Sequence, residues 1–399
     1  MTQIGIQKKE QSTKHMTVEN ICSCLFFATY VLNNTFGDVA SLMWISKSAI
    51  FIFMAFTIFM VLEKQTKFST IVVFFFVSNF AWWMISCVWS PGNVAQISTL
   101  GLNMLFGFCV FLFFSETKDF NLFFRAMFFS GFLLIIYSMS VYGMDGFLSL
   151  LQEEERLGAE ITNENTYGMI FSYAFLAGMY FALYQSKIHY TLGSVLFLFF
   201  SLSSGSRKAI LIILIGTIIL VVLRFGLKHP LKLFIGLILS IFVVYYVLQL
   251  PIFGGTLERF EMLLSNDNKD ASSKERYRMI FVGWELFKEK VVAGWGIGGF
   301  AAVSGFGKYS HNNFVEILVN FGVVGFSLYY SMHFYVLKNL FKKLKTIYPQ
   351  HIMMFTCILV SLIMDYGNVS FVVKWMWIYI GVALALASIT ARDDKKTKI

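Results

Sequence analysis

Long apolar runs separated by short polar stretches repeat along most of the chain. Most of these runs approach the roughly 20 residues that a helix needs to cross about 30 Å of hydrocarbon, and none alternates like a barrel strand. The pattern therefore predicts about twelve transmembrane helices. The predicted spans are 17–33, 42–62, 69–90, 95–114, 121–143, 164–184, 189–204, 207–223, 230–250, 311–337, 349–366 and 370–390.

One long polar stretch, 251–310, interrupts this pattern late in the chain. Some of its apolar residues recur at helical spacing, which predicts an interfacial helix. They are Ile280, Trp284, Phe287 and Val291. We therefore expect an all-α polytopic membrane protein, in which 1–399 is a single integral membrane domain and 251–310 is its one large extracytoplasmic loop.

Composition and charge exclude two classes of protein. With 57% hydrophobic and 14% charged residues, a soluble globule would expose too much apolar surface. The net charge of +9 could suggest a nucleic-acid partner, but most Lys and Arg lie in short clusters beside apolar runs, where they act as topology signals. Their distribution predicts that both termini are cytoplasmic and that the loops 144–165 and 251–310 lie outside. The basic N-terminal segment shows no clear cleavage pattern, so the first helix is expected to be retained.

Two basic residues, Arg207 and Lys208 in "SLSSGSRKAI", break the positive-inside pattern at a very short outer turn. One interpretation is a snorkelling pair that anchors a helix end. However, a cation at a helix start opposes the macrodipole, so an anion shared with the helix N-terminus is the alternative that the position favours. Arg156, in the loop 144–165, is a further basic residue on this side.

The segment "SSKERYRMIFVGWELFKEKVVAGWGIGGF" (272–300) carries two more candidate cations. Arg276 lies four residues before Ile280 and is expected to project from the apolar stripe, whereas Arg278 points more toward water. Headgroup contact is the alternative role for Arg276, and simple solvation is the alternative for Arg278. The following "GWGIGGF" predicts a tight re-entry toward the membrane and not a dinucleotide loop, because no strand precedes it.

His311, in "YSHNNFVEILVNFGVVG", is the one histidine that we expect at the outer face. If Ser310 caps a helix that begins at His311, the helix dipole disfavours the protonated imidazole. A neutral imidazole can take a proton from a hydroxyl near pH 7. An interfacial histidine bonded to its neighbours is the alternative. Asn312 and Glu316 lie one turn apart and could bind hydroxyls or orient this base.

Four other polar residues lie near the outer ends of predicted spans. Asn163 and Tyr167 could bind sugar, but capping of the sixth span explains them equally well. Asp365 and Lys374 flank the last outer turn and are expected to pair with each other. All five cysteines fall in apolar runs, and the outer face lacks a compact cluster of metal ligands. No disulfide, metal site or cofactor is therefore predicted.

Three linked pieces of the chain together resemble the O-antigen polymerase and ligase superfamily of bacterial membrane glycosyltransferases. They are "SGSRKAIL", "RYRMIFVGWELFKEKVVAGWGIGGF" and "YSHNNFVEILVNFGVVG", in that order. The resemblance covers about 200–330. It implies that His311 is the essential histidine and that Arg207 and Arg276 are the paired arginines that handle a lipid diphosphate. The candidate substrate-binding residues are Lys208, Arg278, Asn312, Glu316, Asn163 and Tyr167.

The resemblance also implies an activity. A metal-independent enzyme of the bacterial inner membrane would join undecaprenyl-diphosphate-linked repeat units into O-antigen or capsular polysaccharide at the outer face. Inversion would accompany release of undecaprenyl diphosphate. The motifs look more like polymerases than like ligases, which move finished glycan onto the lipid A core.

The partners implied are the lipid-linked donor and acceptor and the membrane lipids. A chain-length regulator and a flippase are candidate protein partners, and no nucleic-acid partner is expected. A transporter of lipid-linked sugars is the alternative from another functional class. Against it, no internal repeat is visible, and the polar outliers gather at one face instead of the bilayer midplane.

Overall fold

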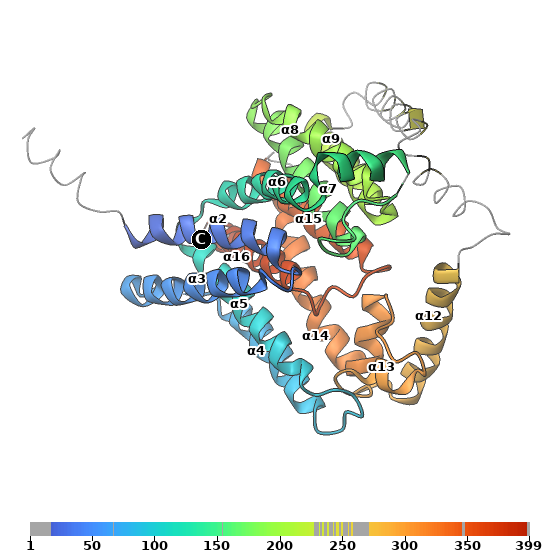
Figure 1. The fold of residues 1–399 in the computed structure, drawn as a ribbon. Coiled ribbons are helices and arrows are strands. Elements are labelled where there is room, and N and C mark those ends of the chain that lie inside the picture. Colours follow the sequence, from blue (N-terminus) through green and yellow to red (C-terminus); the bar gives the residue numbers. More distant parts are fainter. Residues whose placement is uncertain are drawn as a thin grey trace, which may run out of the picture.

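The computed structural model describes residues 17–66, 68–153, 155–226, 271–344 and 348–396, with single positions between 231 and 257. Every regular element within these residues is a helix (Figure 1). The helices are α2 (Val18–Phe36), α3 (Met43–Lys64), α4 (Thr70–Ser86), α5 (Gln96–Thr117), α6 (Phe120–Gln152), α7 (Glu164–Gln185), α8 (Tyr190–Ser203), α9 (Arg207–Phe225), α12 (Ala271–Glu289), α13 (Gly299–Val303), α14 (Asn313–Leu344), α15 (Pro349–Met364) and α16 (Lys374–Lys396).

Seven of the described helices are long and apolar enough to cross a membrane. They are α3, α5, α6, α7, α9, α14 and α16, and the shorter helices α4, α8 and α15 are also apolar. Each predicted span up to 207–223, and each from 311–337 onward, corresponds to one helix. The predicted span 230–250 lies largely outside the described residues. The all-α polytopic fold is confirmed.

The helix α16 lies near the middle of the bundle and packs closely on α5 (Figure 1). A Cβ added to Gly381 would come within 2.4 Å of the Gly107 carbonyl oxygen. Small residues let the backbones of two membrane helices approach in this way. Trp377 of α16 also packs against Trp83 of α4, with ring centroids 5.9 Å apart. The helices α4, α5 and α16 therefore share one core.

The backbone of α14 departs from helical geometry at one residue, where the segment that follows α12 packs against it. The backbone at Gly322 has φ 64°, and a Cβ there would lie 2.2 Å from the Val292 carbonyl oxygen, so the position requires glycine. The N–H of Trp295 donates to the Val319 carbonyl at 2.8 Å, and Gly294 also has a positive φ of 67°. The chain thus makes the predicted tight turn here, and this turn fixes the end of α12 beside α14.

The apolar stripe predicted on α12 is divided between two environments. Trp284 and Val291 are exposed, as expected of an interfacial helix, whereas Ile280 and Phe287 pack inward. The inward side contacts a small cluster formed by Met279, Phe300, Val315 and Val319. Part of the predicted stripe therefore faces the protein, because the hairpin through α13 brings α14 against one side of α12.

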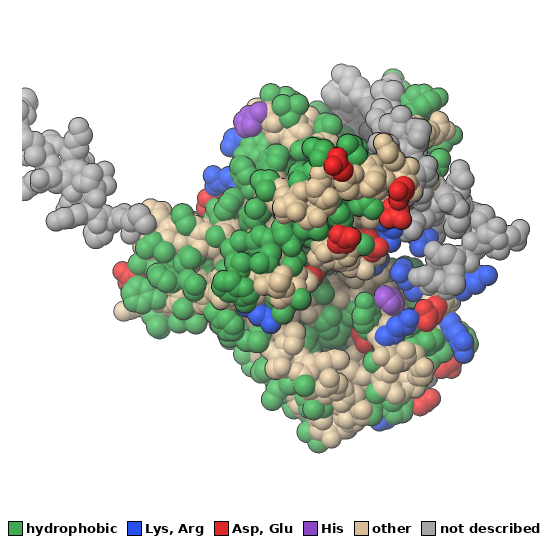
Figure 2. Space-filling model, viewed as in Figure 1, with side chains coloured by type: hydrophobic (Ala, Val, Ile, Leu, Met, Phe, Trp, Pro, Cys, Tyr) green, Lys and Arg blue, Asp and Glu red, His purple; other side chains and the backbone are tan. Residues whose placement is uncertain are grey.

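The surface separates apolar from charged regions (Figure 2). Hydrophobic side chains cover much of the visible face formed by α2, α3, α6 and α8. Basic and acidic side chains, with a histidine among them, gather around a hollow beside α12. A lipid-facing belt and a polar outer region are what a polytopic protein needs, because only the latter can be hydrated.

Candidate active site

His311 lies in the turn that leads into α14, and not within the helix. The helix begins at Asn313, and its N-cap is Asn312, whose Oδ1 accepts from the N–H of Val315 at 3.0 Å. Ser310 closes a local turn instead, because its hydroxyl donates to the Asn312 carbonyl at 2.9 Å. The condition considered from the sequence, that Ser310 caps a helix beginning at His311, is therefore not met. His311 precedes the cap, in the left-handed region with φ 57°.

The Glu316 side chain stabilises this turn through hydrogen bonds. It is buried, and its Oε2 accepts from the N–H of Ser310 at 2.6 Å. Its Oε1 accepts from the Asn320 amide at 3.2 Å, and the Asn320 Oδ1 accepts in turn from the N–H of Phe300 at 2.7 Å. Of the two roles considered for Glu316, this geometry suits orienting the turn that carries His311 better than binding a substrate hydroxyl.

The turn is also bonded to the loop between α15 and α16. The Asn312 amide donates to the Tyr366 carbonyl at 3.1 Å. The Asp365 carboxylate accepts from the Asn313 amide at 3.1 Å and from the Tyr330 hydroxyl at 3.2 Å. The expected pair between Asp365 and Lys374 is not formed among the described residues, because the tight fold of this loop turns the carboxylate inward.

Two cations approach His311 from separate helices. Arg276 lies one turn before the buried Met279, so it projects on the same side of α12 and is half-buried, whereas Arg278 is exposed. As predicted, Arg276 is therefore the more buried of the two arginines and Arg278 the more exposed. Lys208, from α9, reaches the same loop as Asn312, since its Cε lies 3.5 Å from the Cβ position of Gly367.

The surroundings keep the His311 imidazole neutral. Burial, the largest cause, and the positive charges of Arg276, Lys208 and Lys308 together lower its pKa to about 4, while Glu275 opposes them. The neutral state predicted from the sequence is thus reproduced, but its cause is burial and neighbouring cations instead of the helix dipole. The ring also packs on Tyr309, with centroids 4.4 Å apart.

Arg207 is the first residue of α9 and is half-buried. Ser206 caps this helix, because its side-chain oxygen accepts from the N–H of Ala209 at 3.4 Å. Arg207 therefore stands in the same helical turn as Lys208, which acts electrostatically on His311. The start of α9, the inner side of α12 and the entrance to α14 converge on one region.

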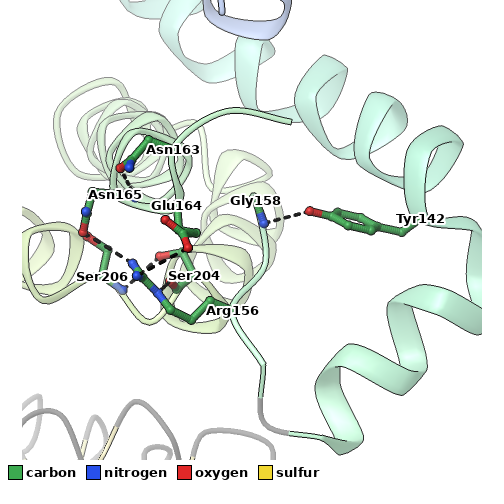
Figure 3. Close-up of polar contacts among 8 residues, drawn as sticks. All are labelled: Tyr142, Arg156, Gly158, Asn163, Glu164, Asn165, Ser204 and Ser206. Atoms are coloured by element: carbon green, nitrogen blue, oxygen red, sulfur yellow. Dashed lines mark hydrogen bonds and ion pairs between the residues drawn. The ribbon is translucent and has the colours of Figure 1, made fainter. Parts of the chain in front are cut away.

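A further arginine, Arg156, holds the turn before α9 (Figure 3). Its Nε donates to the Ser204 carbonyl at 2.9 Å, and its Nη1 lies 3.6 Å from a Glu164 carboxylate oxygen. Sequence reasoning identified Arg156 only as a basic residue on the outer side. Its contacts come from segments far apart in the chain. The only sequence signal for Arg156 was therefore a basic residue in a loop that the positive-inside rule places outside.

Asn163 and Tyr167 occupy structural positions. Asn163 is the N-cap of α7 and accepts from the N–H of Asn165 at 3.0 Å. Tyr167 is fully buried, and its hydroxyl lies 3.0 Å from the Ser138 hydroxyl. The capping alternative describes Asn163, and Tyr167 belongs to the helical core. The guanidinium of Arg278, an exposed residue, lies 5.9 Å from the ring centroid of Phe306.

No group of three or more His, Cys, Asp or Glu side chains within the described residues could hold a metal ion. The five cysteines are all free thiols. The described groups in this region are one imidazole, several cations, hydrogen-bonding amides and the carboxyl groups of Glu275, Glu316 and Asp365.

One comparison with known families concerns the part of the chain that carries these residues. Residues 192–330 match a family model described as O-Antigen ligase. This range covers about a third of the chain and contains Arg207, Arg276 and His311. The match confirms the resemblance to the O-antigen polymerase and ligase superfamily, whose members are membrane glycosyltransferase-like enzymes that act on lipid-linked glycans. A search of curated proteins found no match to the chain.

Proposed function

We propose that this chain is the polymerase type within the O-antigen polymerase and ligase superfamily. It joins lipid-linked oligosaccharide repeat units at the outer face of the bacterial inner membrane, with both termini in the cytoplasm. The observation that carries the proposal is the half-buried His311 imidazole, neutral beside the cations Arg276 and Lys208. A base next to an anion site is what transfer of a glycan from a lipid diphosphate requires.

The donor is a growing glycan on undecaprenyl diphosphate. Arg207 and Arg276 bind its two phosphates, and Lys208 adds a third positive charge. Arginine suits this role because its guanidinium stays charged in a dry site and can bond two phosphate oxygens at once. Negative charge grows on the leaving oxygen as its bond to the anomeric carbon breaks, and the cations stabilise that charge.

The acceptor is a hydroxyl on the non-reducing sugar of another lipid-linked unit. His311 takes the hydroxyl proton while the oxygen attacks the anomeric carbon. The new carbon–oxygen bond forms opposite the departing diphosphate, so the configuration inverts. Holding both lipids in one site supplies the proximity that the reaction needs, and no step uses a metal.

Donor binding also prepares the base. The free site holds the pKa of His311 at about 4, so the imidazole is a weak proton acceptor before the donor arrives. A bound diphosphate offsets the positive charges of Arg276 and Lys208, and the pKa then rises toward its ordinary value. Proton transfer is therefore strengthened only when the leaving group is in place.

Alanine substitutions in a strain lacking the natural gene test the proposal. His311→Ala, Arg207→Ala and Arg276→Ala should each abolish polymer while membrane insertion stays intact. Lys288→Ala is the matched control, because Lys288 is an exposed cation of α12 that pairs with Glu285 at 2.8 Å. Polymer of normal length made by His311→Ala would remove the proposed base.

A gel of lipopolysaccharide from the deletion strain separates the polymerase from the ligase. A core capped with a single repeat unit means that polymerisation is lost. An uncapped core with accumulated lipid-linked polymer means that ligation is lost, and the alternative function would then hold. The closer similarity of "SHNNFVEILVNFGVVG" and "GSRKA" to polymerases supports the first outcome.

A further inference from the structure

We propose that Arg156 is a positioning residue for the cationic side of the site, because it holds the turn between α8 and α9 from which Arg207 and Lys208 project. The inference rests on the proposed function. Arg156 itself lies in the segment between α6 and α7, and its side chain is 22% exposed.

The first contact of Arg156 is with the end of α8. Its Nε donates to the Ser204 carbonyl at 2.9 Å, and the N–H of the next residue, Leu157, donates to the Ser203 carbonyl at 3.0 Å. The last carbonyls of a helix have no partner within the helix and carry its negative dipole end. A guanidinium therefore suits this position, and it ties the segment to the turn at two consecutive carbonyls.

The second contact is with the N-cap of α9 (Figure 3). The Nη2 of Arg156 approaches Asn165 Oδ1 at 3.5 Å, and the same oxygen accepts from the Ser206 hydroxyl at 3.0 Å. Ser206 is the residue that caps α9. Glu164 lies on the other side of the guanidinium, with its oxygen 3.6 Å from Nη1. One side chain thereby joins the start of α7, the end of α8 and the start of α9.

The turn is shaped to fit this side chain. Gly205 has φ 59°, and a Cβ there would lie 3.1 Å from the Arg156 Cγ and 3.2 Å from its Nε. The glycine backbone therefore lies directly against the arginine. Any movement of Arg156 changes the support of the turn that ends at Arg207.

Arg156 acts through its neighbours and not on the base directly. Among the residues that the structure describes, the charged groups that act on the pKa of His311 are Arg276 from α12, Lys208 from α9, and Lys308 and Glu275 at the rim, and the Tyr309 ring packs on the imidazole. Arg156 is absent from this set. If the turn before α9 loosens, Lys208 moves relative to His311, and the imidazole loses part of the influence that keeps it unprotonated.

The test compares Arg156→Gln and Arg156→Lys with Arg224→Gln. Arg224 is a matched control, because its Nε also donates to a helix carbonyl, that of Leu183 at 3.0 Å, but at the opposite end of α9. Each purified variant is assayed for melting temperature and for kcat/KM against pH with lipid-linked repeat units. Arg156→Gln should lower kcat/KM by about tenfold or more and move the acid limb of the profile to higher pH. Arg156→Lys should recover part of both effects.

A role confined to folding would give a different result. Arg156→Gln would then lower the melting temperature, as we expect of Arg224→Gln, and would leave the acid limb where the wild type has it. That outcome overturns the inference, as does an unchanged kcat/KM. Failure of the proposed function is distinguishable, since it would appear as wild-type turnover by His311→Ala.

Discussion

Two exposed charges at the rim of the site should move the pH profile in opposite directions. Lys308 and Glu275 form an ion pair at 3.1 Å, with each side chain 45% exposed, so replacing either one should cost little stability. Lys308 lowers the pKa of His311 and Glu275 raises it. Since the base must be neutral, Lys308→Gln should move the acid limb of kcat/KM to higher pH, and Glu275→Gln should move it to lower pH.

The size of the effect of the neutral base on kcat/KM follows from the His311 pKa of about 4, compared with the ordinary 6.5. At pH 5 about 90% of the imidazole is neutral, whereas at the ordinary pKa only about 3% would be, a difference of about thirtyfold in kcat/KM. A unit charge about 8 Å away in a water-like medium contributes about 0.5 kcal/mol. Each substitution should therefore shift the limb by about 0.4 of a pH unit.

The assay measures kcat/KM for extension of a fluorescent lipid-linked repeat unit by purified protein across the pH range. It is run at low and at high salt, because screening within about 3 Å at 1 M should bring the two variants together. A wild-type limb near pH 6.5 would refute the account of the neutral base. Two variants that shift the limb the same way would refute the assignment of the limb to His311.

Three further results are expected. Gly322→Ala should lower the free energy of unfolding by about 2–4 kcal/mol, because its Cβ would lie 2.2 Å from the Val292 carbonyl oxygen at φ 64°. Gly146→Ala is the control, because an added Cβ there meets nothing nearer than 3.9 Å. Equal melting temperatures of the two variants would contradict the argument. Asn312→Ala should lower the free energy of unfolding by about 1 kcal/mol through loss of the N-cap and should also lower kcat, whereas Asn312→Asp keeps the cap. Thermal unfolding and turnover measurements check both variants. An unaltered melting temperature of Asn312→Ala would argue against the cap. Treatment with EDTA should leave turnover intact, and loss of activity that manganese restores would show that the mechanism needs a metal.

Much of the fold was predictable because hydropathy is a local property. A bilayer demands a fixed length of apolar helix wherever the chain crosses it, so each span could be identified without knowing its neighbours. What the pattern did not specify is which surface each apolar side chain meets. The stripe on α12 predicted an interfacial helix, but only the structure shows that α14 covers one side of that helix, where Met279 is buried.

For the candidate site, the sequence by itself determined the types of group, and it predicted that they lie on the same side of the membrane. A histidine and several cations at the outer ends of apolar runs stand out because ionisable groups are costly there. Only the tertiary structure decided how they meet. Asn312, and not Ser310, caps α14, burial with neighbouring cations keeps His311 neutral, and Arg156 joins three helix ends. The cap is a local contact, but the last two relations depend on contacts between residues distant in the chain, which no local pattern encodes.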